Sequence, residues 1–332
     1  MPTQVTDTEH LSSISLNPDA PHLHLLQGVD FQPVLIMGDH RSGTTLLYKL
    51  LVETNCFNFV NAYHIIKYDQ LLSNRLNETE HQAQQEVNEL FQALGLKNRL
   101  IDKVAVTAGL PEEYGFILEN AGKPPHICPE NLDNFRELCQ KIQFISAPQK
   151  KLLLKNPWDF ANFKYIKSTF PAAKFIFINR HPIHIINSQL KASLSMLSTK
   201  NAYIAAISQQ YAKLYDNRWR LWYRRLRNSL FFQRSLSNAT RDVSQALDYF
   251  IENVNSLPQG DYITVRYEEL SQEPEKVVLS ILNFLQLQPE SPLSYDTLIE
   301  SRPLKLLPGV ASKYEQLHQE LQPYFDYLGY GA

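Results

Sequence analysis

The chain is poor in the residues that mark several specialised classes of protein. Only 3 of its 332 residues are cysteine, and Cys56, Cys128 and Cys139 show no CxxC pair, no metal-site spacing and no disulfide framework. With 11 glycines and 19 prolines, the sequence is neither collagen-like nor of low complexity. No apolar run approaches about 18 residues, so we expect no membrane span.

The N-terminus also lacks a basic stretch followed by an apolar run, so we expect no signal peptide. The cysteines are then expected to be structural thiols in a reducing compartment. Together these absences favour a cytoplasmic enzyme or binding protein. The hydrophobic content of 44% is sufficient for a sizeable core and argues against disorder.

The formal net charge of −2 conceals an uneven distribution of charge. Residues 150–241 contain 17 Lys or Arg and only two acidic residues, Asp159 and Asp216, whereas the remaining 240 residues contain 15 basic and 32 acidic ones. Such an excess is expected either on a solvated face or at a site for an anion.

Short apolar runs alternate with helical patterns along the chain. The runs predict four buried strands, at residues 33–38, 151–155, 174–179 and 261–266. Helices are expected at 44–53, from about 80, at 202–227, at 239–255, from Pro274 and at 312–328. This alternation predicts an α/β fold with a parallel sheet flanked by helices. We expect one domain over 1–332, with a loosely packed lead-in at 1–30 and helical insertions at about 62–150 and 196–256.

Residues 38–45 (GDHRSGTT) join the first predicted strand to the first predicted helix. In that context, the backbone N–H groups of a glycine-containing loop and the helix N-terminus favour an anion, as in P-loop-like proteins. A nucleoside-triphosphate loop would have Lys where Thr44 stands. The loop is therefore better suited to a smaller anionic group, held with the help of Arg41, Ser42, Thr44 and Thr45.

The segment RSGTT resembles the 5′-phosphosulfate loop of sulfotransferases that use 3′-phosphoadenosine 5′-phosphosulfate (PAPS), and is most similar to the bacterial-type branch. The resemblance runs in order from about residue 33 to 287 and implies PAPS as the donor substrate, without a metal. It assigns donor binding to Arg41, Ser42, Gly43, Thr44 and Thr45.

Two further segments resemble the same family. Arg180 follows a strand and Ser188 comes eight residues later, as in the motif that binds the 3′-phosphate. The planar, permanently charged guanidinium of Arg180 suits a phosphate, and Ser188 would add a hydroxyl donor. Lys155 ends the second long strand, where the resemblance implies a catalytic Lys on the bridging oxygen of the phosphosulfate.

The general base is not defined by the resemblance, because Pro157 stands where cytosolic members have a catalytic His. One candidate is His64, near the place where protein-tyrosine sulfotransferases have a catalytic Glu; the alternative is a packing or hydrogen-bonding His. The others are Glu112 and Glu113, which are expected to open a helix and would suit its dipole without any function. His40 is expected near the donor but not as the base, and the segment beginning Tyr267-Glu268 is interpreted as structural.

The implied reaction moves a sulfuryl group to an acceptor hydroxyl or amine and releases adenosine 3′,5′-bisphosphate. We expect a small-molecule, glycan or lipid acceptor, no nucleic acid and no stable membrane insertion; phenols and peptides remain open, as does the oligomeric state. The alternatives are a P-loop-type kinase or phosphotransferase and a noncatalytic nucleotide-binding protein of the same fold.

Residues 218–227 (RWRLWYRRLR) combine aromatic side chains with Arg218, Arg220, Arg224, Arg225 and Arg227. On a helix, the aromatics and Leu226 share one face, which favours an apolar core face with arginines outside. The alternatives are a donor or acceptor pocket, a contact with an anionic membrane, or a nucleic-acid surface. The resemblance also implies that basic residues late in the chain assist at the 3′-phosphate, namely Arg302, Lys305 and Lys313.

Overall fold

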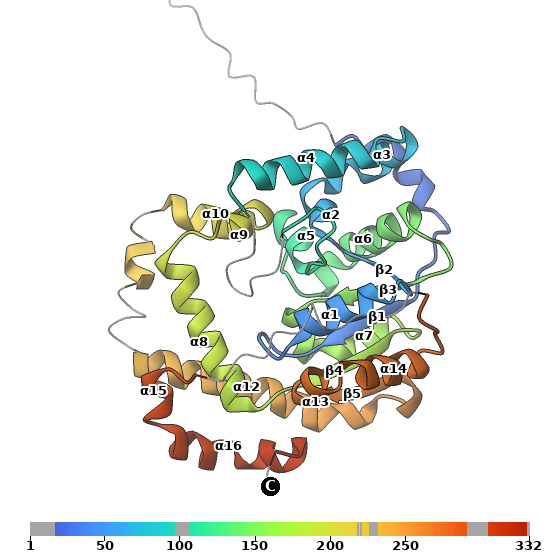
Figure 1. The fold of residues 1–332 in the computed structure, drawn as a ribbon. Helices are drawn as coiled ribbons and strands as arrows, with labels where there is room; N and C mark the ends of the chain where they lie inside the picture. Colours follow the sequence, from blue (N-terminus) through green and yellow to red (C-terminus); the bar gives the residue numbers. More distant parts are fainter. Residues whose placement is uncertain are drawn as a thin grey trace, which may run out of the picture.

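The computed structural model describes residues 17–96, 106–217, 219, 221–225, 232–290 and 305–330. Among them, five parallel strands form one sheet in the order β2-β3-β1-β4-β5 (Figure 1). The strands are β1 (Pro33–Met37), β2 (Phe57–Phe59), β3 (Lys151–Lys155), β4 (Lys174–Asn179) and β5 (Tyr262–Arg266). The predicted α/β fold is confirmed, and each of the four expected strands lies within one residue of its predicted bounds.

The sequence does not predict β2, the edge strand. It has three residues, Phe-Asn-Phe, which is too few to show an alternating pattern. Its backbone pairs with β3, so that Phe59 lies opposite Leu153. The Asn58 side chain donates to the carbonyl of Ala147 at 2.7 Å, which ties the strand to the turn before β3.

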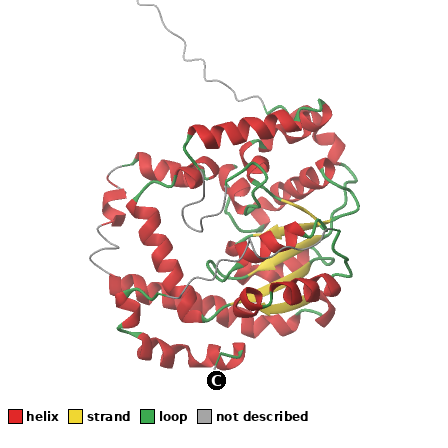
Figure 2. Cartoon of the chain, viewed as in Figure 1, coloured by secondary structure: helices red, strands yellow, loops and turns green. Residues whose placement is uncertain are grey.

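Helices cover both faces of the sheet, as Figure 2 shows. Within the described ranges, none of them is long and apolar enough to cross a bilayer. They are α1 (Thr44–Glu53), α2 (Ala62–Ile66), α3 (Leu71–Leu76), α4 (Glu80–Ala93), α5 (Gly115–Asn120), α6 (Leu132–Ile145), α7 (Phe163–Thr169), α8 (Pro182–Ser198), α9 (Ala202–Ile207), α10 (Gln209–Asp216), α12 (Phe232–Asn253), α13 (Tyr267–Gln272), α14 (Pro274–Phe284), α15 (Pro308–Ala311) and α16 (Tyr314–Leu328).

The central strand β1 shows how the two apolar layers form. Val34 and Ile36 face a cluster that includes residues of α1 and α14, whereas Leu35 and Met37 face a larger cluster that includes residues of α6, α7, α8, α12 and α16. All five residues of β1 are buried, because both faces of a parallel sheet are covered by helices.

Two predicted helices differ from the structure. The expected helix at 202–227 is broken at Ser208, whose side chain accepts the N–H of Tyr211 and caps α10. This local hydrogen bond competes with continuation of the preceding helix, so α9 and α10 are separate. The other is α12, which begins at Phe232 rather than at 239.

The expected lead-in at 1–30 is described from residue 17 onward, and it contacts the rest of the protein at a few points. Residues Ala20–Leu26 form a 3-10 helix, and Asp19 before it is fully buried. The Asp19 carboxylate pairs with the buried ammonium of Lys141 on α6 at 3.1 Å and accepts the N–H of Ser73 at 2.9 Å. This segment is therefore fixed to the helical region that precedes β3.

The expectation of an apolar core face at 218–227 is also wrong for the described residues. The side chains of Trp219, Trp222 and Tyr223 are 81%, 55% and 60% exposed, respectively, and only Leu221 is buried. Arg218, Arg220, Leu226 and Arg227 lie outside the described residues.

Candidate active site

The carboxyl ends of four strands bring the predicted binding residues to one edge of the sheet. β1 leads into residues 38–43, β3 ends at Lys155, β4 is followed by Arg180, and β5 by Tyr267. β1 lies between β3 and β4, so connections to its two sides run in opposite directions across the sheet. Open parallel sheets bind ligands at such switch points.

The loop after β1 has the backbone geometry of an anion-binding turn. Gly43 has φ +107° and Arg41 has φ 74°, both in the left-handed region, and Ser42 N–H donates to the carbonyl of Asp39 at 3.1 Å. A Cβ on Gly38 would lie 2.8 Å from the carbonyl oxygen of Ile178, so that position has no room for a side chain. α1 starts directly after the loop, and its first N–H groups have no acceptor within the helix.

Arg41, Arg180 and Ser188 form one cluster. The Arg41 Nε donates to Ser188 Oγ at 3.1 Å, and an Arg180 amino group donates to the Arg41 carbonyl at 3.1 Å. The two predicted phosphate anchors, the loop and the Arg180 segment, are thus joined directly. Among the described residues, Ser42 Oγ and Arg180 Nε are buried without a hydrogen-bond partner. Oxygens of a bound anion would satisfy such donors, so these residues fit a phosphate-bearing ligand.

Tyr267 lies between the two anchors, a position that the sequence does not reveal. Its ring lies 4.1 Å from the guanidinium carbon of Arg180 and would overlap a Cβ placed on Gly43. The neighbouring Glu268 accepts the N–H of His181 at 3.3 Å and the hydroxyl of Tyr330 at 2.6 Å. The segment interpreted as structural therefore orients the residues around the expected phosphate sites.

Lys155 is buried and has two partners at its ammonium group. It pairs with Glu113 Oε1 at 2.8 Å and donates to Thr45 Oγ1 at 3.0 Å. The Glu113 side chain keeps 13% of its surface exposed, so the pair lies at the boundary between the core and solvent. The structure thus brings together a cation, a carboxylate and the loop hydroxyl.

The two candidate glutamates do not open a helix, contrary to expectation. α5 begins at Gly115, and Glu112 follows Pro111, which forms an isolated bridge with Asn61. Glu112 is fully buried and accepts the hydroxyl of Tyr203 at 2.7 Å. Adjacent residues therefore have different partners: Glu112 accepts the Tyr203 hydroxyl, and Glu113 pairs with Lys155.

A buried network fixes the segment after Lys155. The Asn156 amide donates to the Asp159 carboxylate at 2.7 Å, and the Tyr114 hydroxyl donates to the same carboxylate oxygen at 2.5 Å. Burial raises the pKa of Asp159, and the hydrogen bonds from Tyr114 and neighbouring groups oppose that rise. Because Tyr114 follows Glu113 directly, this network also holds Glu113 near Lys155.

His64 is a helix-capping residue on α2. Its Nδ1 accepts the N–H of Asn61 at 3.2 Å, and the Asn61 side chain accepts the His64 N–H at 3.0 Å. Burial lowers the pKa of His64 to about 3, although a backbone hydrogen bond with Phe59 acts in the opposite direction.

His40 packs within the loop rather than at the Lys155 pair. Its ring lies 5.0 Å, edge to face, from that of Trp158, and its N–H donates to Asp39 Oδ1 at 2.6 Å. Gln189 on α8 donates to the other Asp39 oxygen at 3.1 Å. Burial is the main cause of the raised pKa of Asp39, whose role the sequence does not indicate.

Of the three late basic residues expected to assist at the 3′-phosphate, Lys305 and Lys313 are described by the structure. The backbone carbonyl of Lys305 accepts the Asn187 side-chain amide at 3.3 Å, which ties this segment to α8. Lys313 precedes α16, and Arg302 lies outside the described residues.

With this geometry in view, comparison with known proteins identifies the class. A family model described as "Sulfotransferase family" matches residues 33–291, and the chain belongs to that family. It is thus a transferase of the sulfotransferase type. The comparison with curated proteins gives no match.

The fold is similar to solved bacterial sulfotransferases. Sulfotransferase STF9 from Mycobacterium avium is 14% identical, with a TM-score of 0.62 over 93% of this chain and 79% of that one. Sulfotransferase STF1 from Mycobacterium tuberculosis H37Rv is also 14% identical, with a TM-score of 0.55 over 92% and 80% of the two chains. At this identity, the likeness supports the fold and not the identity of the substrates.

Proposed function

We propose that the protein transfers the sulfuryl group of PAPS to an acceptor hydroxyl or amine and releases adenosine 3′,5′-bisphosphate. One observation carries the proposal: the loop of residues 38–45, the Lys155–Glu113 pair and Arg180 meet at one edge of the sheet of a sulfotransferase-family chain. The loop follows the central strand β1, with Lys155 at the end of β3 on one side and Arg180 after β4 on the other. Two neighbouring anion sites, with a buried Lys beside the loop, match a donor that has a phosphate at 3′ and a phosphosulfate at 5′.

The donor's two charged ends have separate partners in this proposal. The 5′-phosphosulfate lies on the loop, where Ser42, Gly43, Thr44 and Thr45 supply N–H and hydroxyl donors at the start of α1. The 3′-phosphate binds the guanidinium of Arg180, with Ser188 and the Arg41 side chain beside it. Charge-assisted hydrogen bonds of this kind are among the stronger ones in proteins.

Lys155 and Glu113 are the proposed catalytic pair. The acceptor oxygen or nitrogen attacks sulfur as the bond from sulfur to the bridging oxygen of the phosphate breaks. Glu113 takes the acceptor's proton, and Lys155 stabilises the negative charge that develops on the departing bridging oxygen. We assign the base to Glu113 rather than His64 because Glu113 contacts Lys155, whereas both hydrogen bonds between His64 and Asn61 serve the α2 cap.

Ligand-dependent stabilisation tests the donor. A ligand that binds only the folded state raises the stability by about 2.7 kcal/mol at a concentration of 100 times its Kd. Adenosine 3′,5′-bisphosphate should therefore raise Tm clearly, whereas ATP with Mg²⁺ should have little effect. The reverse result would favour the kinase alternative. Arg180→Ala should weaken the bisphosphate far more than adenosine 5′-phosphate, and equal losses would remove Arg180 from the 3′ site.

Turnover tests the base, with His64 as the matched comparison. With radiolabelled PAPS and a set of acceptor classes, Glu113→Gln should lower kcat by about 10²–10⁴-fold, the usual contribution of general base catalysis. His64→Asn should retain turnover at its optimum. Normal turnover by Glu113→Gln would remove Glu113 from this role. The same screen covers small-molecule, glycan and lipid acceptors, which the site geometry leaves open.

A further inference from the structure

The three most exposed large apolar or aromatic side chains of the described residues lie within five consecutive positions of the sequence. They are Trp219, Trp222 and Tyr223, and every other large hydrophobic side chain described is at most 46% exposed. The rings of Trp219 and Trp222 lie 6.2 Å apart, edge to face. Isolated exposed hydrophobic residues are common, but a group with two tryptophans marks a contact surface.

The helical segment that carries these rings is attached to the rest of the protein through its other side chains. Leu221 is buried, and its N–H donates to the carbonyl of Asn217 at 3.0 Å. The guanidinium of Arg225 donates to the carbonyls of Leu197 and Ser198, at the end of α8, at 2.6 and 3.0 Å. The aromatic side chains are thus exposed while the same segment is anchored by Leu221 and Arg225.

Along the sequence, the charged residues on either side of these rings are almost all positive. Asp216 is the only acidic residue in the sequence between positions 200 and 234. The described basic side chains in that stretch are exposed, namely Lys200, Lys213, Arg224, Arg225 and Arg234. Within residues 150–241, this stretch therefore has many basic residues and only one acidic residue to offset them.

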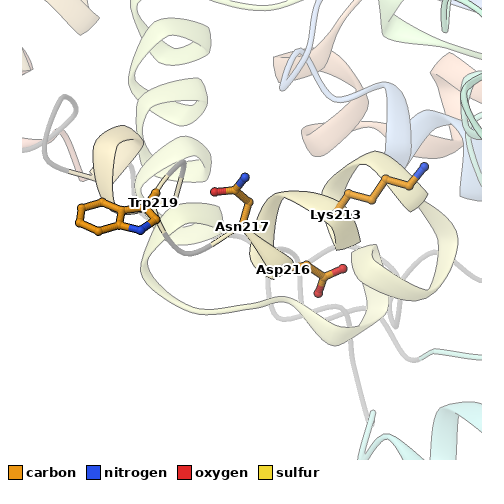
Figure 3. A pocket seen from close by; sticks show the side chains of 4 residues that line it. All are labelled: Lys213, Asp216, Asn217 and Trp219. Carbon is orange, nitrogen blue, oxygen red and sulfur yellow. The ribbon is translucent and has the colours of Figure 1, made fainter.

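An open hollow of about 490 Å³ adjoins Trp219 and is also lined by Lys213, Asp216 and Asn217. Figure 3 shows the Trp219 ring at one side of this hollow and the Lys213 side chain at the other, with Asn217 between them. In Figure 1 the short gold helix between two grey stretches lies at the outer margin of the molecule, beyond α8. These aromatic side chains therefore belong to the periphery of the molecule, away from the sheet.

We infer that this aromatic–basic surface, formed by Trp219, Trp222 and Tyr223 with Lys213 and Arg224, binds the face of an anionic lipid bilayer. Trp and Tyr are preferred at the boundary between headgroups and acyl chains, because they combine an apolar ring with a polar group. Lys and Arg beside them attract anionic headgroups. The contact is peripheral and adds to the proposed transfer reaction without depending on it.

A bilayer fits these observations better than a nucleic acid. The two indoles are almost perpendicular, at 82°, so they do not form a common platform for stacked bases. A long polyanion would also extend over the remaining chain, which has 15 basic and 32 acidic residues outside 150–241. A bilayer needs to contact only the aromatic–basic surface.

Vesicle flotation tests the inference. The full chain should float with vesicles of phosphatidylglycerol and phosphatidylcholine, much less with phosphatidylcholine alone, and less as salt is added. Trp219→Ala/Trp222→Ala should lower partitioning about tenfold, since it removes the apolar contact area. Lys213→Gln/Arg224→Gln should also lower it about tenfold and reduce its dependence on salt.

The matched control is Leu90→Ala/Leu94→Ala, which removes two exposed apolar side chains near the end of α4 and should leave vesicle binding unchanged. Each variant is first required to keep the wild-type Tm and far-UV circular-dichroism spectrum, so that a loss of vesicle binding is distinguished from a loss of the fold. Equal binding to neutral and anionic vesicles, or normal vesicle binding by the Trp double variant, would overturn the inference. So would loss of self-association or of RNA binding in the Trp double variant, with no effect on vesicles.

Discussion

The strongest quantitative prediction concerns His64, for which the sequence leaves two roles open. In the folded protein the imidazole of His64 stays neutral, because burial lowers its pKa from 6.5 to about 3. Between these values the unfolded chain binds more protons than the folded one. This contribution to stability is therefore complete above about pH 6.5 and is lost progressively as the pH falls toward 3.

The magnitude follows from the size of that shift. A pH of 5 lies about 1.5 units below the pKa of this imidazole in the unfolded chain, and each unit corresponds to about 1.4 kcal/mol. Lowering the pH from 7 to 5 should therefore cost about 2 kcal/mol through His64 alone. His181 and His184 also have lowered pKa values, mainly from burial, and add their own acid sensitivity to the wild-type curve.

Comparison with His64→Asn isolates the contribution of His64. Asn retains a side-chain acceptor near the position of Nδ1 and cannot titrate. Urea unfolding at pH 7 and pH 5 should show a loss of stability that is about 2 kcal/mol smaller in the variant than in the wild type. Equal losses in the two proteins, or a measured His64 pKa near 6.5 in the folded state, would refute the capping interpretation and restore His64 as a candidate base.

Three other predictions concern packing and the donor site. Lys141→Met should destabilise the protein by about 3–5 kcal/mol in urea unfolding, because Asp19 is left buried and unpaired; Asp19→Leu/Lys141→Met should recover much of the loss, and a small single-variant effect would contradict the buried pair. Gly43→Ala should weaken binding of adenosine 3′,5′-bisphosphate in calorimetry, since it combines a positive φ with overlap at Tyr267, whereas Gly122→Ala, also at positive φ but in open space, should bind normally. Tyr267→Leu should weaken the bisphosphate more than adenosine 5′-phosphate, and Tyr267→Phe should not; equal losses for both ligands would remove the ring from this role.

The sequence predicts the elements around the donor site well because they have strong local signals. Residues 152–154 (LLL) and 175–178 (FIFI) are continuous apolar runs, and 38–45 combine two glycines with small hydroxyl side chains between a strand and a helix. Such patterns indicate the local backbone conformation, which depends mainly on residues close together in the sequence.

The Lys155–Glu113 contact could not be predicted in the same way. Its partners are 42 residues apart, and Glu113 has the same local pattern as Glu112, although one contacts Lys155 and the other Tyr203. Which carboxylate faces the site depends on the bridge between Pro111 and Asn61 and on the network at Asp159. Long-range packing of this kind has no local signature. The same limit applies to residues 218–227, where helical periodicity indicates that aromatics share a face but not whether that face is covered.

Part of the excess of positive charge in residues 150–241 has an explanation that the composition does not offer. Several of these lysines pair with carboxylates from the acidic remainder of the chain: Lys150 with Glu290, and Lys167 and Lys174 with Asp261, at 2.7–2.8 Å. These pairs join segments that are distant in sequence, so part of the asymmetry is the complementarity of a folded chain. Because no acidic residue other than Asp216 occurs between positions 200 and 234, local sequence cannot balance the cations there. We therefore expect an external anionic surface to interact with that stretch rather than with the whole basic block.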